Sequence, residues 1–187
     1  MALCLPALLA GRPLYDLLTI YLGQASSYPR LTSSAPNLYQ WLPDNAGVFG
    51  RAGLIFAVTL AGFLSYTCLR SDTPWGKELT VRLALASALL VPFTLPYMHE
   101  RYFYAADCIA IVYAFYFPRR FYIPLAVVTI SLFSYFPFLF NDMTVITLPH
   151  LALLLALVLI VVLADLCKAL YPTPRPTSND TAGQFSL

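Results

Sequence analysis

Four side chains able to do chemistry lie close together near the middle of the chain: His99, Glu100, Arg101 and Asp107. An arginine binds a phosphate group through its planar, bidentate fork, and a histidine donates a proton or a hydrogen bond near neutral pH. Asp107 follows Tyr104 by three residues and Glu100 by seven, a spacing that puts all three on one face of a helix. This cluster predicts a site that binds a phosphate group, with carboxylates beside it.

A simpler interpretation stays open for the same residues. The run Pro96–Tyr104 joins two apolar segments through only a few polar residues, so it must form a tight turn. Glu100 and Arg101 also suit the surface of a plain solvated turn. Pro92 and Pro96 favour the site, because prolines free backbone carbonyls that suit a lined cavity better than a lipid-facing wall.

A long loop at 24–50 carries the second group of polar residues. It contains three prolines, and loops of this length are often functional. Its aromatic residues fit the belt that tyrosine and tryptophan form at the lipid headgroups. With the neighbouring amides they also fit a lid that binds a sugar by stacking and hydrogen bonding. The aromatic residues are Tyr28, Tyr39 and Trp41, and the amides are Gln24, Asn37 and Gln40.

The composition excludes most soluble classes. Hydrophobic residues make up 59% of the 187 residues and charged residues only 11%, whereas soluble domains carry about 25% charged residues. The net charge of +2 and the lack of a long Lys/Arg run argue against a nucleic-acid partner. The predicted partner is the lipid bilayer.

The apolar segments predict an all-α fold, a polytopic transmembrane helix bundle with about five full spans and a partial or interfacial N-terminal helix. A span needs about 20 apolar residues. The expected spans are Ala52–Leu69, Leu79–Met98, Phe103–Phe117, Phe121–Phe140 and His150–Cys167.

The two ends of the chain differ from these spans. The N-terminal segment fits either one broken span, Leu3–Leu22, or a helix end followed by an interfacial helix from Leu14 to Leu22, and we favour the second interpretation. The predicted transmembrane domain covers 1–170, with the outside loop 24–50 and an outside turn at 97–104. The tail at 171–187 has a composition typical of disorder.

The distribution of Lys and Arg predicts the orientation. If the loop 24–50 lies outside, seven basic residues fall inside and four outside, and Arg119-Arg120 forms a compact inner anchor. The prediction is a multi-pass membrane protein with a cytoplasmic C-terminus. Asp165 and Lys168, three residues apart near the last inner helix end, are interpreted as a modest surface pair.

The run Leu95-Pro-Tyr-Met-His-Glu-Arg-Tyr-Phe-Tyr-Ala-Ala-Asp107 resembles a motif of polytopic bacterial glycosyltransferases of the GT-C class. In those enzymes Pro-x-Met-His-Glu-Arg-Tyr lies near the C-terminal end. The group that it resembles is the bacterial set related to the second mannosyltransferase of GPI-anchor synthesis. Gly11-Arg-Pro, Gln24, Ala35-Pro-Asn-Leu-Tyr39 and Trp41 also resemble the outside loop before that motif. The spans after this motif contribute to the resemblance only through their hydropathy.

The resemblance implies transfer of a mannose-like hexose from a polyprenyl-phosphate donor to an acceptor on the outer face of the bacterial plasma membrane. On the matching positions, His99 and Arg101 would hold the donor phosphate. Glu100 would orient them, with Tyr102 and Asp107 in support. The residues lining the sugar or acceptor side would be Gln24, Asn37, Tyr39 and Trp41.

The sequence departs from this family in one respect. GT-C enzymes carry a catalytic Asp or Glu in the first outside loop, near the N-terminus, and this chain lacks that loop. No catalytic or metal-binding residue is therefore predicted, no cofactor is identified, and the chain is expected to be a C-terminal portion that is inactive alone. Two other functions stay open, a small transporter or flippase and an accessory subunit of a larger membrane complex.

Overall fold

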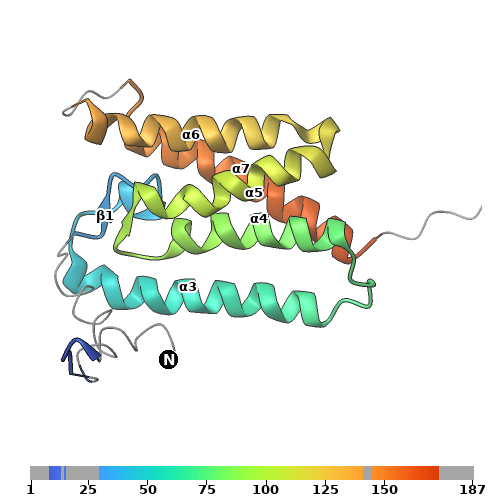
Figure 1. Cartoon of the computed structure of the whole chain (residues 1–187), viewed down its shortest axis with the longest axis horizontal. Helices are drawn as coiled ribbons and strands as arrows, with labels where there is room; N and C mark the ends of the chain where they lie inside the picture. The colour runs from blue at the N-terminus through green and yellow to red at the C-terminus, as the bar shows by residue number, and fades with distance from the viewer. Residues whose placement is uncertain (1–8, 14, 16–29, 141–144, 173–187) are drawn as a thin grey trace, which may run out of the picture.

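The computed structural model describes residues 9–13, 15, 30–140 and 145–172. Its long helices are α3 (Ala46–Leu69), α4 (Lys77–Thr94), α5 (Tyr104–Tyr116), α6 (Tyr122–Leu139) and α7 (Leu148–Leu170). Shorter elements are the strands β1 (Thr32–Ser33) and β2 (Met98–His99) and the 3₁₀ helices η2 (Leu38–Trp41), η3 (Glu100–Phe103) and η4 (Pro118–Arg120). Consecutive long helices run in opposite directions along one axis (Figure 1).

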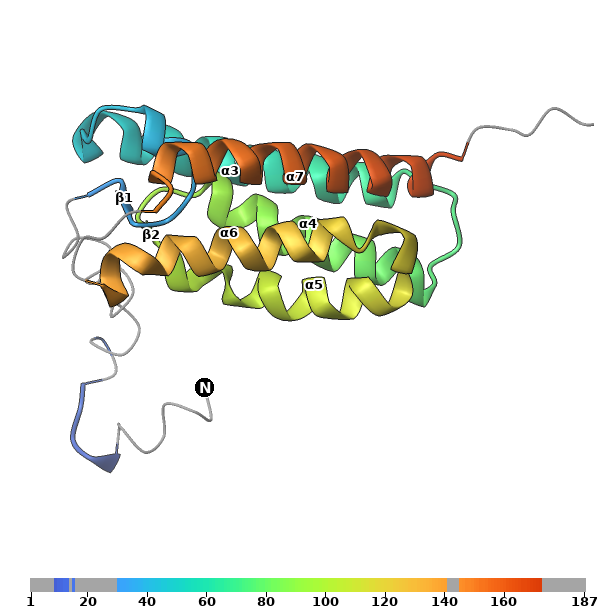
Figure 2. The same cartoon turned by 90° about the horizontal axis from the view of Figure 1, so that it is seen from above.

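Four of these helices form a ring. α4 packs against α5, α5 against α6, α6 against α7, and α7 back against α4. Figure 2 shows α7 and α5 on opposite sides, with α4 and α6 between them. The ring encloses an apolar core that includes the buried residues Leu85, Leu89, Ala110, Val127 and Leu155. α3 lies outside the ring, against α4.

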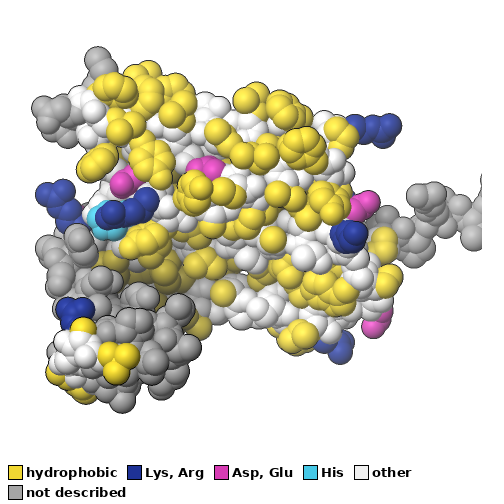
Figure 3. Space-filling view, viewed as in Figure 1, with side chains coloured by type: hydrophobic (Ala, Val, Ile, Leu, Met, Phe, Trp, Pro, Cys, Tyr) yellow, Lys and Arg dark blue, Asp and Glu magenta, His cyan; other side chains and the backbone are white. Residues whose placement is uncertain are grey.

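Three of the helices, α3, α6 and α7, are long and apolar enough to cross a membrane. Hydrophobic side chains also cover much of the flank of the bundle (Figure 3). The chain is therefore a membrane protein, and the all-α prediction is confirmed. α4 carries three charged residues in its first two turns, and α5 has only 13 residues, about 20 Å of helix. α4 and α5 are therefore not among the described helices that are both long and apolar enough to span a membrane.

α4 ends four residues before the expected boundary at Met98, for a local reason. Leu95 precedes Pro96, and a residue before proline disfavours the helical conformation. Leu95 is accordingly extended, with φ −79° and ψ 134°. The turn between α4 and α5 therefore starts earlier in the sequence than the end of the apolar run suggests.

α3 begins at Ala46, so the loop expected to reach Gly50 ends earlier. Asn45 caps this helix by accepting a hydrogen bond from the Val48 amide at 3.2 Å, and asparagine is among the preferred N-cap residues. The predicted N-terminal helix and the tail fall largely on 1–8, 14, 16–29 and 173–187, which lie outside the described residues.

A buried carboxylate links the helices of the ring to one another at the end opposite to the strands. Asp165 of α7 is only 5% exposed. It accepts hydrogen bonds from Arg82 Nε of α4 at 3.0 Å and from the Tyr113 hydroxyl of α5 at 2.8 Å. It also forms an ion pair with Arg120 of η4. One side chain thus connects four segments, and its charge is compensated, as a buried charge must be.

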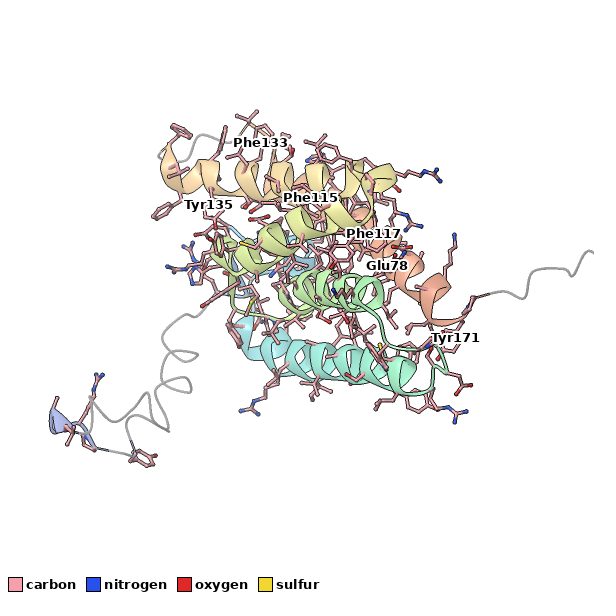
Figure 4. All side chains as sticks on the ribbon, turned by 45° about the vertical axis from the view of Figure 1, so that its right-hand side comes forward. Glu78, Phe115, Phe117, Phe133, Tyr135 and Tyr171 are labelled. Carbon is pink, nitrogen blue, oxygen red and sulfur yellow. The ribbon has the colours of Figure 1, made fainter. Side chains whose placement is uncertain are left out.

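Arg82 has partners on its other sides as well. Its guanidinium lies 3.9 Å from the centroid of the Phe117 ring, a cation–π contact, and one of its nitrogens is 3.4 Å from the Glu78 carboxylate. Figure 4 shows Phe117 and Glu78 at this end of the bundle. These contacts hold Arg82 in the position where it meets Asp165.

The predicted surface pair of Asp165 with Lys168 is wrong. Asp165 follows Val162 by three residues and continues the buried stripe of α7 that Leu155 and Leu159 begin, so it faces the ring. Lys168 is exposed. The spacing of the apolar residues in α7 decides that Asp165, and not Lys168, is buried. The partners of Asp165 come from the other elements of the ring.

Asp165→Asn should lower the free energy of unfolding by about 3 kcal/mol, because breaking a buried ion pair leaves Arg120 without its counter-charge and Arg82 with only the exposed Glu78. Unfolding titrations with sodium dodecyl sulfate in mixed micelles measure this loss. Lys168→Gln, on the same helix but exposed, is the matched control and should change stability by less than about 0.5 kcal/mol. Equal stabilities of the two variants would contradict the role of Asp165.

Candidate functional site

The two segments predicted to be functional lie against each other at one end of the bundle, here called the strand end. β1 of the loop pairs in parallel with β2 of the His-Glu-Arg turn, with Thr32 opposite Met98 and Ser33 opposite His99. In Figure 1 β1 lies where α3 begins and α4 ends. α3 and α4 run in opposite directions, so the end of α4 lies next to the loop that precedes α3 (Figure 1).

Side chains of the loop fold it into a compact unit. The Asp44 carboxylate accepts a hydrogen bond from the Leu31 amide at 2.8 Å. Gln40 Nε2 donates to the Ala35 carbonyl at 2.7 Å. Leu31 and Ala35 are fully buried, and Ala35 belongs to the core of the ring. The loop is therefore docked on the bundle.

Tyr39 fastens this loop to the ring. Its hydroxyl donates to the Thr94 carbonyl at 2.8 Å, and the last carbonyls of a helix have no partner within the helix. Burial raises the pKa of the Tyr39 phenol, so the hydroxyl keeps the proton that it donates. The phenol fits because α3 has Gly53 at the contact, where a Cβ atom would overlap the Tyr39 oxygen.

A second tyrosine is seated on α3 in the same way. The Tyr97 hydroxyl donates to the Ala46 carbonyl at 3.3 Å, and a Cβ atom at Gly50 would overlap its phenol. Tyr97 has φ 63° and Ser34 has φ 57°, a left-handed conformation that costs a non-glycine residue about 1–3 kcal/mol. Both residues flank the β1–β2 pair, and such strain clusters at functional sites.

The predicted phosphate-binding residues lie beside this pair. His99 is half-buried, whereas Arg101 and Tyr102 are exposed. The rings of His99 and Tyr102 meet edge-on with their centroids 5.9 Å apart, which orients the imidazole. Arg101 forms no ion pair with the described residues, so its guanidinium is available to an anion. Figure 3 shows Lys or Arg side chains gathered with a histidine at this end.

The two carboxylates of the cluster keep hydrogen-bonding capacity. Glu100 is 9% exposed and makes no hydrogen bond or ion pair with the described residues. One oxygen of Asp107 accepts a hydrogen bond from the Ser131 hydroxyl of α6 at 2.7 Å. Its other oxygen is buried with no hydrogen-bond partner among the described residues. Tyr104, expected on the same helical face, is 68% exposed.

The residues predicted to line the sugar side divide into three groups. Asn37 and Tyr39 are buried, at 0% and 3% exposure, and both hold the loop: Asn37 caps η2 by accepting the Tyr39 amide at 3.1 Å. Trp41 is 44% exposed, so its indole face is available for stacking. Gln24 lies outside the described residues.

Two residues of α6 join the site without having been predicted. Ser131 bonds Asp107. Tyr135 follows Ser131 by four residues, which is about one turn of α6. Figure 4 shows Tyr135 on the side of α6 that faces α5. The available signal was the polar set Ser131, Ser134 and Tyr135 in an otherwise apolar run, since residues three and four apart share a helical face.

The described residues contain no group of three or more His, Cys, Asp or Glu side chains that could hold a metal ion. No family model matches the chain, and no curated protein or solved structure matches it significantly. The interpretation of the site therefore rests on its geometry and on the chemistry of its residues.

Gly53→Ala should displace Tyr39 and break its hydrogen bond to Thr94, which lowers the free energy of unfolding by about 1–3 kcal/mol. Gly62→Ala is the matched control, because a Cβ atom there meets nothing within 4 Å. Alanine also favours a helix over glycine by about 1 kcal/mol, so Gly62→Ala should be neutral or stabilising.

Detergent unfolding and amide hydrogen exchange across residues 30–45 measure both effects. If Gly53→Ala and Gly62→Ala gave the same stability and the same protection of the loop, Tyr39 would not be what docks it.

Proposed function

We propose that the chain is the C-terminal portion of a GT-C-class membrane glycosyltransferase. It would transfer a mannose-like hexose from a polyprenyl-phosphate donor to an acceptor on the outer face of the membrane. The observation that carries the proposal is the β1–β2 pair, because it joins into one site the two segments that bear the resemblance. This site lies at one end of an apolar bundle, within reach of a phosphate group at the membrane surface.

In this proposal His99 and Arg101 bind the donor phosphate. Arg101 offers a bidentate fork that no described carboxylate occupies, and His99 adds a hydrogen-bond donor. Negative charge develops on the departing phosphate as the glycosidic bond breaks, and preorganised cationic donors stabilise that charge. Glu100, which the resemblance assigns to orienting the two residues, lies between them in the chain but forms no hydrogen bond or ion pair with either, whereas the Tyr102 ring contacts the imidazole.

The loop contributes to the sugar or acceptor side. Trp41 offers its half-exposed indole for stacking, and the resemblance assigns Gln24 to the sugar or acceptor as well. Asn37 and Tyr39 act through the loop, since their hydrogen bonds fix its course over the turn. The acidic catalytic residue of a GT-C enzyme would come from a preceding segment or from a partner membrane subunit, so we expect the chain alone to bind donor poorly and to transfer nothing.

We infer that all five helices cross the bacterial plasma membrane, with the strand end outside and the C-terminus in the cytoplasm. The alternating helix directions (Figure 1) support this orientation. They put Arg70, Lys77, Arg119 and Lys168 at the end opposite to Arg101, as the excess of basic residues on the cytoplasmic side requires.

The two helices that fall short of the length and hydropathy of a span are compatible with this arrangement. The charge of Arg82 in α4 is compensated by Asp165, which removes most of the cost of placing it in a bundle. α5 is extended by η3 at one end and by η4 soon after the other. α4 and α5 therefore run along the bundle beside the longer helices (Figure 1).

His99→Ala and Arg101→Ala should each lower hexose transfer by the full-length enzyme at least about 100-fold, the loss typical of removing a preorganised charge-stabilising donor. Membrane insertion should be unchanged. The measurement is incorporation of radiolabelled mannose from its polyprenyl-phosphate donor in isolated membranes. Arg51→Ala is the matched control, since Arg51 is an exposed arginine near the start of α3, and it should keep the wild-type rate.

Wild-type rates in both variants would overturn the phosphate assignment. A loss of solute passage in place of sugar transfer would favour a transporter. Co-purification with a larger membrane complex, together with tolerance of changes at His99, would favour an accessory subunit.

A further inference from the structure

α3 and α4 leave an apolar groove between them in the halves that lie away from the strand end. Its volume is about 340 Å³. Ala61 and Ser65 of α3 and Ser87 of α4 lie along it, and side chains as small as these leave space that larger ones would fill. The groove therefore follows from the residue types of both helices.

The walls of this groove favour hydrocarbon over water. Leu64 of α3 and Leu83 of α4 are among them, and α3 is long and apolar enough to cross a membrane. A trapped water needs two to four polar partners, but the Ser65 hydroxyl already donates to the Ala61 carbonyl at 2.9 Å. An empty groove would forfeit dispersion contacts, so in a bilayer an apolar group fills it.

The size of the groove fits an acyl chain better than a helix. Ala61 and Leu69, which both line it, are eight residues apart, or about 12 Å along α3. Spread over this length, 340 Å³ gives a mean cross-section of about 28 Å², whereas a helix about 10 Å wide has about 80 Å². The width is that of a single hydrocarbon chain.

The end of the groove away from the strand end has the features of a lipid headgroup site. Trp75 lines this end and is 56% exposed, and tryptophan favours the membrane–water interface. Arg70 follows α3 and Lys77 begins α4. Both are exposed, and neither forms an ion pair with the described residues, including the nearby Asp72. Figure 3 shows Lys or Arg side chains at this end of the bundle.

The connection that carries these residues is fixed to the ring. The hydroxyls of Ser71 and Thr73 each donate to the Leu170 carbonyl at the end of α7, both at 2.7 Å. The Tyr171 hydroxyl donates to the Thr67 carbonyl of α3 at 2.8 Å. The charged end of the groove is therefore held in place before any lipid arrives, which lowers the cost of binding.

We propose that this groove binds one anionic phospholipid of the adjacent leaflet. One acyl chain lies between α3 and α4, and the phosphate meets Arg70 and Lys77. The lipid fills the space beside α3, the helix outside the ring, and so braces α3 against α4. This site lies at the end of the bundle opposite to the strand end and does not depend on the proposed function.

The headgroup is tested by native mass spectrometry of the purified protein, titrated with phosphatidylglycerol or phosphatidylcholine of the same acyl chains. The wild-type protein should bind phosphatidylglycerol more tightly. The double variant Arg70→Gln/Lys77→Gln should weaken phosphatidylglycerol about 25-fold, five-fold for each basic residue, and leave phosphatidylcholine unchanged. Arg51→Gln is the matched control, because Arg51 is an exposed arginine near the other end of α3, and it should change neither affinity.

The acyl chain is tested by filling the groove. Ala61→Leu should abolish binding of both lipids at this site, and Ser87→Leu should do so from the opposite wall. Ala52→Leu is the matched control, because Ala52 is an exposed alanine of α3 outside the groove, and it should bind both lipids as the wild type does.

Three results would overturn the proposal. Equal affinities of the wild type for the two phospholipids would remove the headgroup site. Unchanged binding in both groove-filling variants would place the lipid elsewhere. Tighter binding of a polyprenyl phosphate than of phosphatidylglycerol, lost in Ala61→Leu, would assign the groove to the donor lipid.

Discussion

One buried carboxylate organises the end of the bundle away from the site. Asp165 can lie inside an apolar ring because Arg82, Arg120 and the Tyr113 hydroxyl converge on it, and an uncompensated charge there would be strongly destabilising. These partners come from α4, η4 and α5, so the contact sets how four segments lie relative to one another. The site depends on that arrangement, because α4 leads into β2 and α5 begins directly after the His-Glu-Arg turn.

At the strand end the same requirement, that buried polar groups find partners, is met by a hydroxyl and the backbone. Tyr39 satisfies a carbonyl at the end of α4, and the glycines of α3 leave room for Tyr39 and Tyr97. These contacts hold the left-handed conformations of Ser34 and Tyr97 in place. Among the described residues, two buried side-chain atoms have no hydrogen-bond partner, Asn37 Nδ2 of the loop and Asp107 Oδ1 of α5.

The parts of the site that could be predicted are those contained in one short stretch. His99, Glu100, Arg101 and Asp107 lie within a few residues of one another, so their residue types alone indicate phosphate chemistry. The roles of Asn37 and Tyr39 could not be predicted, since their burial depends on the loop docking on α4. Tyr135 was missed because its proximity to Glu100 depends on α6 packing against α5 and η3, which the spacing of residues along one chain does not report.

The sequence by itself determined the class of protein and the positions of its helices. Each of the five expected apolar segments overlaps one helix, and local chemistry set boundaries such as the end of α4 before Pro96 and the start of α3 after Asn45. Only the tertiary structure decided the ring order, the burial of Asp165 and the meeting of β1 with β2. The physical reason is that lipid-facing and core-facing residues of a membrane bundle are equally apolar, so hydropathy locates a helix without showing which of its faces meets another.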